Sequence, residues 1–170
     1  MNPASHTPAQ AAILRRNNVV VQGHDQGRPA LVFVNGFGSD QSTWRMVAPN
    51  FAGEHRVVLF DHVGIGRSEL SASNAIRYAS LQGYADDLLE VCDAAGAHNA
   101  VLVGHSVGAI IGMLAAIRWP SAFTTWCWSR LRPATSTTAA TWAASNARTL
   151  TPCWRRWRPT TGTGPTRWRR

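Results

Sequence analysis

The sequence has few cysteines and no long hydrophobic run, and both absences narrow what the chain can be. Its three cysteines, Cys92, Cys127 and Cys153, show no metal-ligand spacing and suggest no disulfide framework. No uncharged apolar stretch is long enough to cross a bilayer, so we expect no membrane span. Residues 1–16 lack the apolar core and cleavage pattern of a secretion signal. These absences predict a cytoplasmic protein.

The part of the chain after Phe123 has no carboxylate, no histidine and none of the residues Val, Ile, Phe, Tyr and Lys. Residues 124–170 contain nine arginines, whereas residues 1–123 contain eight arginines and nine acids. Six of the eight tryptophans also follow Phe123. The formal net charge of +8 therefore belongs to the tail and indicates nothing about the body.

The body alternates apolar, β-branched runs with amphipathic stretches. The pattern predicts strands over residues 17–22, 29–34, 55–60 and 99–103 and helices over residues 41–51, 78–96 and 109–116. Such alternation is typical of an α/β fold with a mostly parallel sheet and flanking helices on both faces. In such a sheet, ligands bind at the carboxyl ends of the strands.

One strand end carries Gly104-His-Ser-Val-Gly108, between the apolar strand and an apolar helix. A G-x-S-x-G sequence between a strand and a helix is typical of a nucleophile elbow, in which a sharp turn presents the serine hydroxyl. The alternative is a small-residue turn whose serine does nothing. The context on both sides favours Ser106 as a nucleophile.

A second strand end carries Asn35-Gly-Phe-Gly38. The backbone N–H of Phe37, together with that of Val107 behind the serine, is suited to bind a developing oxyanion. Taken alone, this loop is better interpreted as an ordinary glycine turn. Its place beside an elbow favours the oxyanion role.

The third strand end carries Asp61 and His62. We expect Asp61 to fasten its own turn, residues 61–68, by an Asx-type hydrogen bond. His62 is a conceivable base for Ser106, but nothing in its spacing places it there. His105 lies inside the elbow, where we expect it to support the turn rather than take a proton.

These stretches together resemble a known family. The similar segments are residues 35–45, 59–68, 77–86 and 103–115, and the resemblance extends over residues 17–123. They resemble the RsbQ group of α/β-hydrolases, regulators of the bacterial general stress response, to which the plant strigolactone and karrikin receptors are related. In two places the chain departs from the group: Asn35 stands where the family usually has histidine, and Gly108 where the group usually has serine.

The resemblance implies a serine hydrolase, or a hydrolase-like sensor, with a small apolar pocket over a Ser-Asp-His triad. It implies a small hydrophobic ligand or ester, no metal or cofactor and, in the bacterial branch, a sensor phosphatase as partner. The resemblance implies that Ser106 is the nucleophile and that the backbone N–H groups of Phe37 and Val107 bind the oxyanion. The residues expected to form or support the elbow are Gly104, His105, Gly108, Asn35, Gly36 and Asp61.

The triad partners of Ser106 are absent from the sequence that follows it. In this fold the acid and the histidine come after the serine along the chain, and no carboxylate or histidine follows Ser106 here. Without them the hydroxyl is a weak nucleophile, so we expect little hydrolysis. The expected organisation is a flexible N-terminus (residues 1–16), a truncated α/β-hydrolase domain (residues 17–123) and an irregular basic tail (residues 124–170).

The tail has three interpretations. Arginine with interleaved tryptophan, as in residues 153–158, suits binding to nucleic acid or anionic lipid, and the composition also suits a solvated extension. The third is translation in a shifted frame: the alternative frame of residues 125–129 permits Leu-Val-Leu-Val, a strand that the family carries there. We favour the shifted frame and so expect no nucleic-acid partner. The nucleotide sequence around codon 123 tests it.

Overall fold

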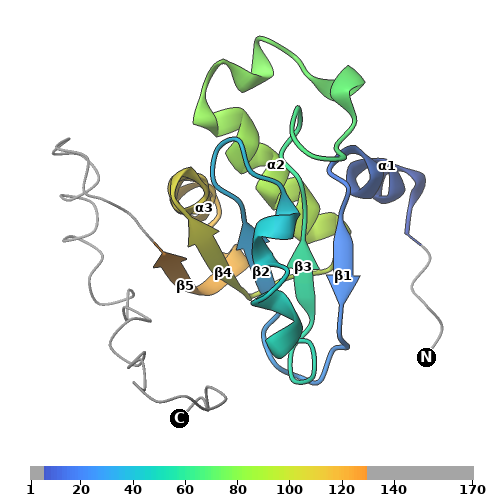
Figure 1. Ribbon diagram of the computed structural model, residues 1–170, viewed down its shortest axis with the longest axis vertical. Coiled ribbons are helices and arrows are strands. Elements are labelled where there is room, and N and C mark those ends of the chain that lie inside the picture. The colour runs from blue at the N-terminus through green and yellow to red at the C-terminus, as the bar shows by residue number, and fades with distance from the viewer. Residues whose placement is uncertain (1–5, 130–170) are drawn as a thin grey trace, which may run out of the picture.

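The computed structural model describes residues 6–129, which form a five-stranded sheet with helices packed on it (Figure 1). The strands are β1 (Val20–Gln22), β2 (Leu31–Val34), β3 (Val57–Leu59), β4 (Ala100–His105) and β5 (Phe123–Ser129). Their order across the sheet is β1-β3-β2-β4-β5, and only β1 runs antiparallel to its neighbour. The predicted α/β fold with a mostly parallel sheet is confirmed.

One face of the sheet is covered by three α-helices, α1 (Pro8–Arg16), α2 (Leu81–Ala94) and α3 (Val107–Arg118). Val32, Val58 and Leu102 of the strands pack there against Leu88 of α2 and Ile111 of α3. Helix α2 begins where the Ser80 side chain accepts a hydrogen bond from the N–H of Gln82, and it ends before Gly96, whose φ is +63°.

The opposite face of the sheet is covered by η1 (Gln41–Trp44) and η2 (Ala48–Asn50), two of the short 3-10 turns. The other 3-10 turns of the fold are η3 (Leu70–Ala72), η4 (Arg77–Ala79) and η5 (Pro120–Ala122). Trp44 of η1 and Ala48 of η2 bury Phe33 and Leu59 of the sheet. The predicted α-helix over residues 41–51 is therefore wrong. Pro49 lacks an N–H and its ring clashes with the carbonyl four residues earlier, which prevents a continuous helix.

The expectation of a flexible segment over residues 1–16 is wrong for residues 8–16. Thr7 and Gln10 form a capping box, Pro8 opens α1, and Ile13 packs on the core. The helix continues to Arg16, so the predicted strand over residues 17–22 keeps only its last three residues, those of β1.

The tail boundary expected at residue 124 also needs correction. Residues 124–129 belong to β5, which pairs in parallel with β4 through Leu102 and Trp126. Its Thr and Trp residues favour extended structure, so the sheet accepts them. The rest of the tail, with the nucleic-acid, lipid and shifted-frame interpretations placed on it, lies outside the described residues. Within residues 6–129, no helix is long and apolar enough to cross a membrane.

Candidate functional site

Ser106 lies at the turn between β4 and α3. Its backbone has φ 54° and ψ −123°, an angle pair that costs energy for any residue with a Cβ. Its side chain is exposed at the carboxyl end of the sheet. The turn therefore presents the hydroxyl to solvent at the first turn of α3, as a nucleophile elbow does.

The glycines of the elbow (residues 104–108) permit this turn. A Cβ on Gly104 would lie 2.6 Å from Cα of Ala109, and a Cβ on Gly108 would overlap the carbonyl oxygens of Val34 and Asn35. Glycine at both places lets α3 fold back directly onto β4 and β2. The related group usually carries serine at residue 108. In this chain the glycine has no side chain, so α3 lies close to the end of β2.

The glycine loop (residues 35–38) lies beside the elbow because β2 and β4 are neighbours, with Val34 opposite Gly104. A Cβ on Gly36 would lie 2.8 Å from Nδ1 of His105. The carbonyl of Gly36 accepts hydrogen bonds from the N–H and the hydroxyl of Ser39, at 3.3 and 2.9 Å. The structure thus brings the two predicted parts of the site together.

Two backbone donors beside Ser106 have no acceptor among residues 6–129. Phe37 lies in the turn of the glycine loop with its side chain 80% exposed, and its N–H makes no hydrogen bond to the described protein. Val107 is the first residue of α3, where an N–H has no acceptor within the helix. These are the two backbone N–H groups that were predicted from the sequence to bind an oxyanion.

Asn35 anchors the start of the glycine loop. It is fully buried, and its side chain donates to the carbonyl of Phe60 at 2.8 Å and accepts from Nε1 of Trp44 at 2.7 Å. Its backbone carbonyl lies 3.1 Å from Nε2 of His62. Other segments of the chain therefore contact this residue, and no sequence pattern predicted the contacts from Trp44 and His62.

Asp61 fastens the loop that follows β3. Its carboxylate accepts from the N–H of Arg67 at 2.9 Å, within its own turn, and from the N–H of Gln41 at 2.8 Å. It also accepts from the side chain of Asn18 at 2.8 Å. The carboxylate is thus occupied in holding three loops and acts as a support rather than as a proton carrier.

The two histidines near the site are both engaged elsewhere. His62 is 2% exposed; burial lowers its pKa, and the hydrogen bond with Asn35 and the charges of Asp87 and Asp61 oppose that shift only in part. The ring of His105 meets Trp44 edge-on at 6.4 Å. Within residues 6–129, no hydrogen bond joins either imidazole to Ser106. The described site therefore has an exposed serine hydroxyl and two backbone donors, and no imidazole is hydrogen-bonded to that hydroxyl.

Lowering the pH below 6.5 is expected to destabilise the fold through His62. Because the native pKa lies below the ordinary value of 6.5, the unfolded chain takes up this proton first as the pH falls. The stability is full above pH 6.5 and is lost below it, through the native pKa, by at most about 1.4 kcal/mol per pH unit. Urea unfolding across this range measures the slope.

The matched variant His62→Gln keeps an N–H donor but does not titrate, so it should flatten that slope. The titratable groups near the His62 ring are Asp61, Asp87 and Tyr84. Hydrogen bonds from Arg77 and Arg16 outweigh burial and lower the pKa of Glu90 below 4.5, so Glu90 titrates outside this range. An unchanged slope in His62→Gln would show that other groups cause it.

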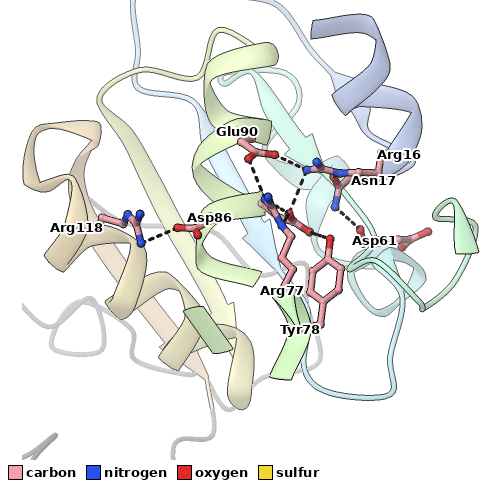
Figure 2. Close-up of polar contacts among 9 residues, drawn as sticks. Arg16, Asn17, Asp61, Arg77, Tyr78, Asp86, Glu90 and Arg118 are labelled. Carbon is pink, nitrogen blue, oxygen red and sulfur yellow. Dashed lines mark hydrogen bonds and ion pairs between the residues drawn. The ribbon is translucent and has the colours of Figure 1, made fainter. Parts of the chain in front are cut away.

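A charge cluster that the sequence analysis missed joins α1, η4 and α2 (Figure 2). Asp87 is fully buried, and Arg77 donates to its Oδ1 from Nη2 at 2.6 Å and from Nε at 3.1 Å. Arg16 lies 3.2 Å from the same oxygen, and Arg16 and Arg77 both bind Glu90, at 2.7 and 2.8 Å. Tyr78 donates to Oδ2 of Asp87 at 2.9 Å.

The pKa shifts in the charge cluster follow its contacts. Burial disfavours the charged form of Arg77, but hydrogen bonds with Glu90 and Asp87 outweigh it and raise its pKa. Burial and the charge of Asp87 raise the pKa of Tyr78 to about 12, so the hydroxyl remains a donor. One sequence signal was present: Asp87 falls on the apolar face of α2, where a carboxylate needs partners.

The comparisons with known proteins agree with this geometry. The alpha/beta hydrolase fold family matches residues 29–125. Strigolactone esterase D14 of Arabidopsis thaliana is 43% identical over 115 residues, which cover 68% of this chain and 42% of that protein. Karrikin insensitive 2 receptor CA of Petunia hybrida is 36% identical over 108 residues, covering 64% and 39%.

A solved hydrolase of Oleispira antarctica, olei00960, has the same fold, with a TM-score of 0.66 and 32% identity over 70% of this chain and 43% of that one. The chain thus spans about two fifths of the length of these relatives. The residues that match the family contain strands β2, β3 and β4, the glycine loop and the elbow. The chain therefore belongs to the α/β-hydrolase fold family, and its N-terminal part is similar to the strigolactone and karrikin receptor group.

Proposed function

We propose that this chain is a hydrolase-like sensor of a small hydrophobic molecule, with Ser106 as the reacting or contacting group. The single observation that carries the proposal is the backbone of Ser106, held at φ 54° close to Gly104 and Gly108, where an added Cβ would clash with neighbouring backbone atoms of this chain. A fold keeps such strain where the surrounding structure gains a function from it. The N–H groups of Phe37 and Val107, which have no acceptor among residues 6–129, support the proposal as candidates for an oxyanion hole.

The hydrophobic character of the ligand has two supports. Phe37 is 80% exposed beside the elbow, and Ile110, one turn along α3 from Ser106, is 38% exposed. The names of the relatives, an esterase and a receptor, support an ester or a similar small molecule. A hollow between α3 and the sheet is lined by residues that include Gly104 and Gly108 of the elbow and Trp126 of β5, but Ser106 does not line it.

We further propose that this chain hydrolyses esters slowly, since no acid and base follow Ser106 in it. The resemblance to the RsbQ group supports a regulatory role in the general stress response, with a sensor phosphatase as partner. In such a role, occupancy of the site by a ligand matters more than turnover.

A fluorophosphonate probe is expected to label Ser106 and no other serine. The serine oxygen attacks phosphorus, fluoride leaves, and the hydroxyl proton passes to water because no base is at hand. The labelling rate should therefore rise steadily with pH and show no plateau near the pKa of a histidine. Intact-protein and peptide mass spectrometry measure both the rate and the site.

Two variants control this experiment. Ser106→Ala should abolish labelling, whereas Ser42→Ala, which removes an exposed serine of η1, should leave it unchanged. Labelling that persists in Ser106→Ala would contradict the proposed function. A rate that levels off near pH 6 to pH 7 would instead show that a histidine acts as the base.

A further inference from the structure

We propose that His62 is the residue that positions the glycine loop for oxyanion binding, by holding the peptide between Asn35 and Gly36. The inference rests on the proposed function, because it concerns how Phe37 presents its N–H beside Ser106. His62 acts through the backbone of another segment, so it is a positioning residue.

The topology places His62 next to the loop. It follows β3, which pairs in parallel with β2 through Phe33 and Leu59, so the two strands end side by side. Its Nε2 lies 3.1 Å from the carbonyl oxygen of Asn35. A carbonyl only accepts hydrogen bonds, so Nε2 carries the proton and Nδ1 is left unprotonated.

The surroundings of the ring agree with that assignment. Nδ1 of His62 is buried and has no hydrogen-bond partner among residues 6–129, so the bond to Asn35 alone selects the tautomer. Phe60 and Tyr84 meet the ring edge-on, at 5.4 and 5.5 Å between centroids. The imidazole is therefore packed between two aromatic rings, and its one hydrogen bond within the described part of the chain is to the glycine loop.

The chemistry of the peptide group connects this contact to Phe37. Each peptide unit is planar, so a fixed carbonyl also fixes the N–H on the other side of the bond. His62 fixes the unit between Asn35 and Gly36. Ser39 fixes the next unit by its two hydrogen bonds to the carbonyl of Gly36, and that unit ends in the N–H of Phe37.

Only the two backbone dihedral angles of Gly36 join these two peptide units. Glycine has the widest range of dihedral angles, so the loop would move freely there if either unit were released. The side chain of Asn35 does not replace His62, because both of its polar groups are taken by Phe60 and Trp44. Loss of the His62 contact should thus loosen the N–H of Phe37 without removing any atom from the oxyanion hole.

Phenylboronic acid tests the inference on the full chain. The Ser106 oxygen forms a bond to boron, the hydroxyl proton leaves to water, and boron becomes a tetrahedral anion whose oxygen needs the two N–H groups. Binding is measured by calorimetry. His62→Phe, which keeps a ring but loses the donor, should weaken binding about tenfold. His62→Gln, whose amide can donate to the same carbonyl, should bind within about threefold of the parent chain.

The possible outcomes separate the two proposals. If the parent chain binds, Ser106→Ala does not, and His62→Phe binds as tightly as the parent, the inference on His62 is overturned while the proposed function stands. If the parent chain forms no boronate on Ser106, the proposed function fails. Unfolding in urea checks that each variant is folded.

A second measurement decides the case in which His62→Phe does not fold or the boronate does not form. Long-range ¹H–¹⁵N spectra of the parent chain should show the His62 proton on Nε2. The amide signals of Gly36 and Phe37 should shift more in His62→Gln than those of α2. A proton on Nδ1, or unshifted loop amides, would overturn the inference whichever way the boronate experiment ends.

Discussion

Replacing Asp87 by alanine is expected to lower the free energy of unfolding by about 3–5 kcal/mol. The carboxylate is fully buried on α2 and is the common partner of Arg16, Arg77 and Tyr78. Its removal leaves the phenol of Tyr78 without an acceptor and leaves the guanidinium groups of Arg16 and Arg77 with Glu90 as their remaining carboxylate. Desolvated donors that lose a charged partner are costly. Urea unfolding followed by circular dichroism measures the loss.

Asp86 is the matched control for that variant because it is the neighbouring carboxylate on the same helix. It pairs with Arg118 at 3.0 Å, where the two side chains are 31% and 59% exposed. A pair exposed to solvent contributes about 0–1 kcal/mol, so Asp86→Ala should change stability little. Equal losses in the two variants would show that the buried cluster contributes no more than a surface pair.

Replacing Gly104 by alanine is expected to destabilise the elbow and to abolish fluorophosphonate labelling of Ser106. The new Cβ would lie 2.6 Å from Cα and 2.8 Å from N of Ala109, and both are backbone atoms that cannot rotate away. Either α3 moves off β4 or the turn at Ser106 opens, and overpacking of this kind costs about 1–3 kcal/mol or more. Both changes displace the hydroxyl from the N–H groups that should face it.

Gly112 offers a matched comparison, because it is a second buried glycine and lies within α3 itself. A Cβ there would approach only the terminal Cδ1 of Leu102, at 3.2 Å, and that end of a flexible side chain can turn aside. Alanine also favours the helix over glycine by about 1 kcal/mol. Gly112→Ala should therefore keep its labelling. If Gly104→Ala labels as fast as Gly112→Ala, the elbow does not depend on close contact between β4 and α3.

The sequence predicted the elements whose residues show a regular period. The predicted strands over residues 29–34 and 99–103 overlap β2 and β4 of the central sheet. Strand β2 is buried along its whole length, whereas buried and half-buried residues alternate in β4. Helix α2 was equally visible from its spacing. The prediction of an α-helix over residues 41–51 was wrong because it rested on the helical spacing of Trp44 and Phe51. Pro49 prevents an α-helix there.

The site was predictable where one short segment defines it. Gly104-His-Ser-Val-Gly108 identifies the elbow because the turn itself requires small residues. Asn35 contacts three residues from other segments of the chain, Trp44, Phe60 and His62. No local sequence pattern predicts contacts between such segments. The partners of Asp87 were hidden for the same reason, although its place on an apolar helix face was a sign that partners exist.

The order of strands across the sheet has a consequence for how the chain folds. Strand β2 lies in the middle, and both of its neighbours, β3 and β4, come later in the sequence. Pairing of β2 with β4 joins residues as far apart as Leu31 and Val101, so a long loop must close before the contact stabilises anything. We therefore expect the glycine loop and the elbow to come together late in the folding of this sheet.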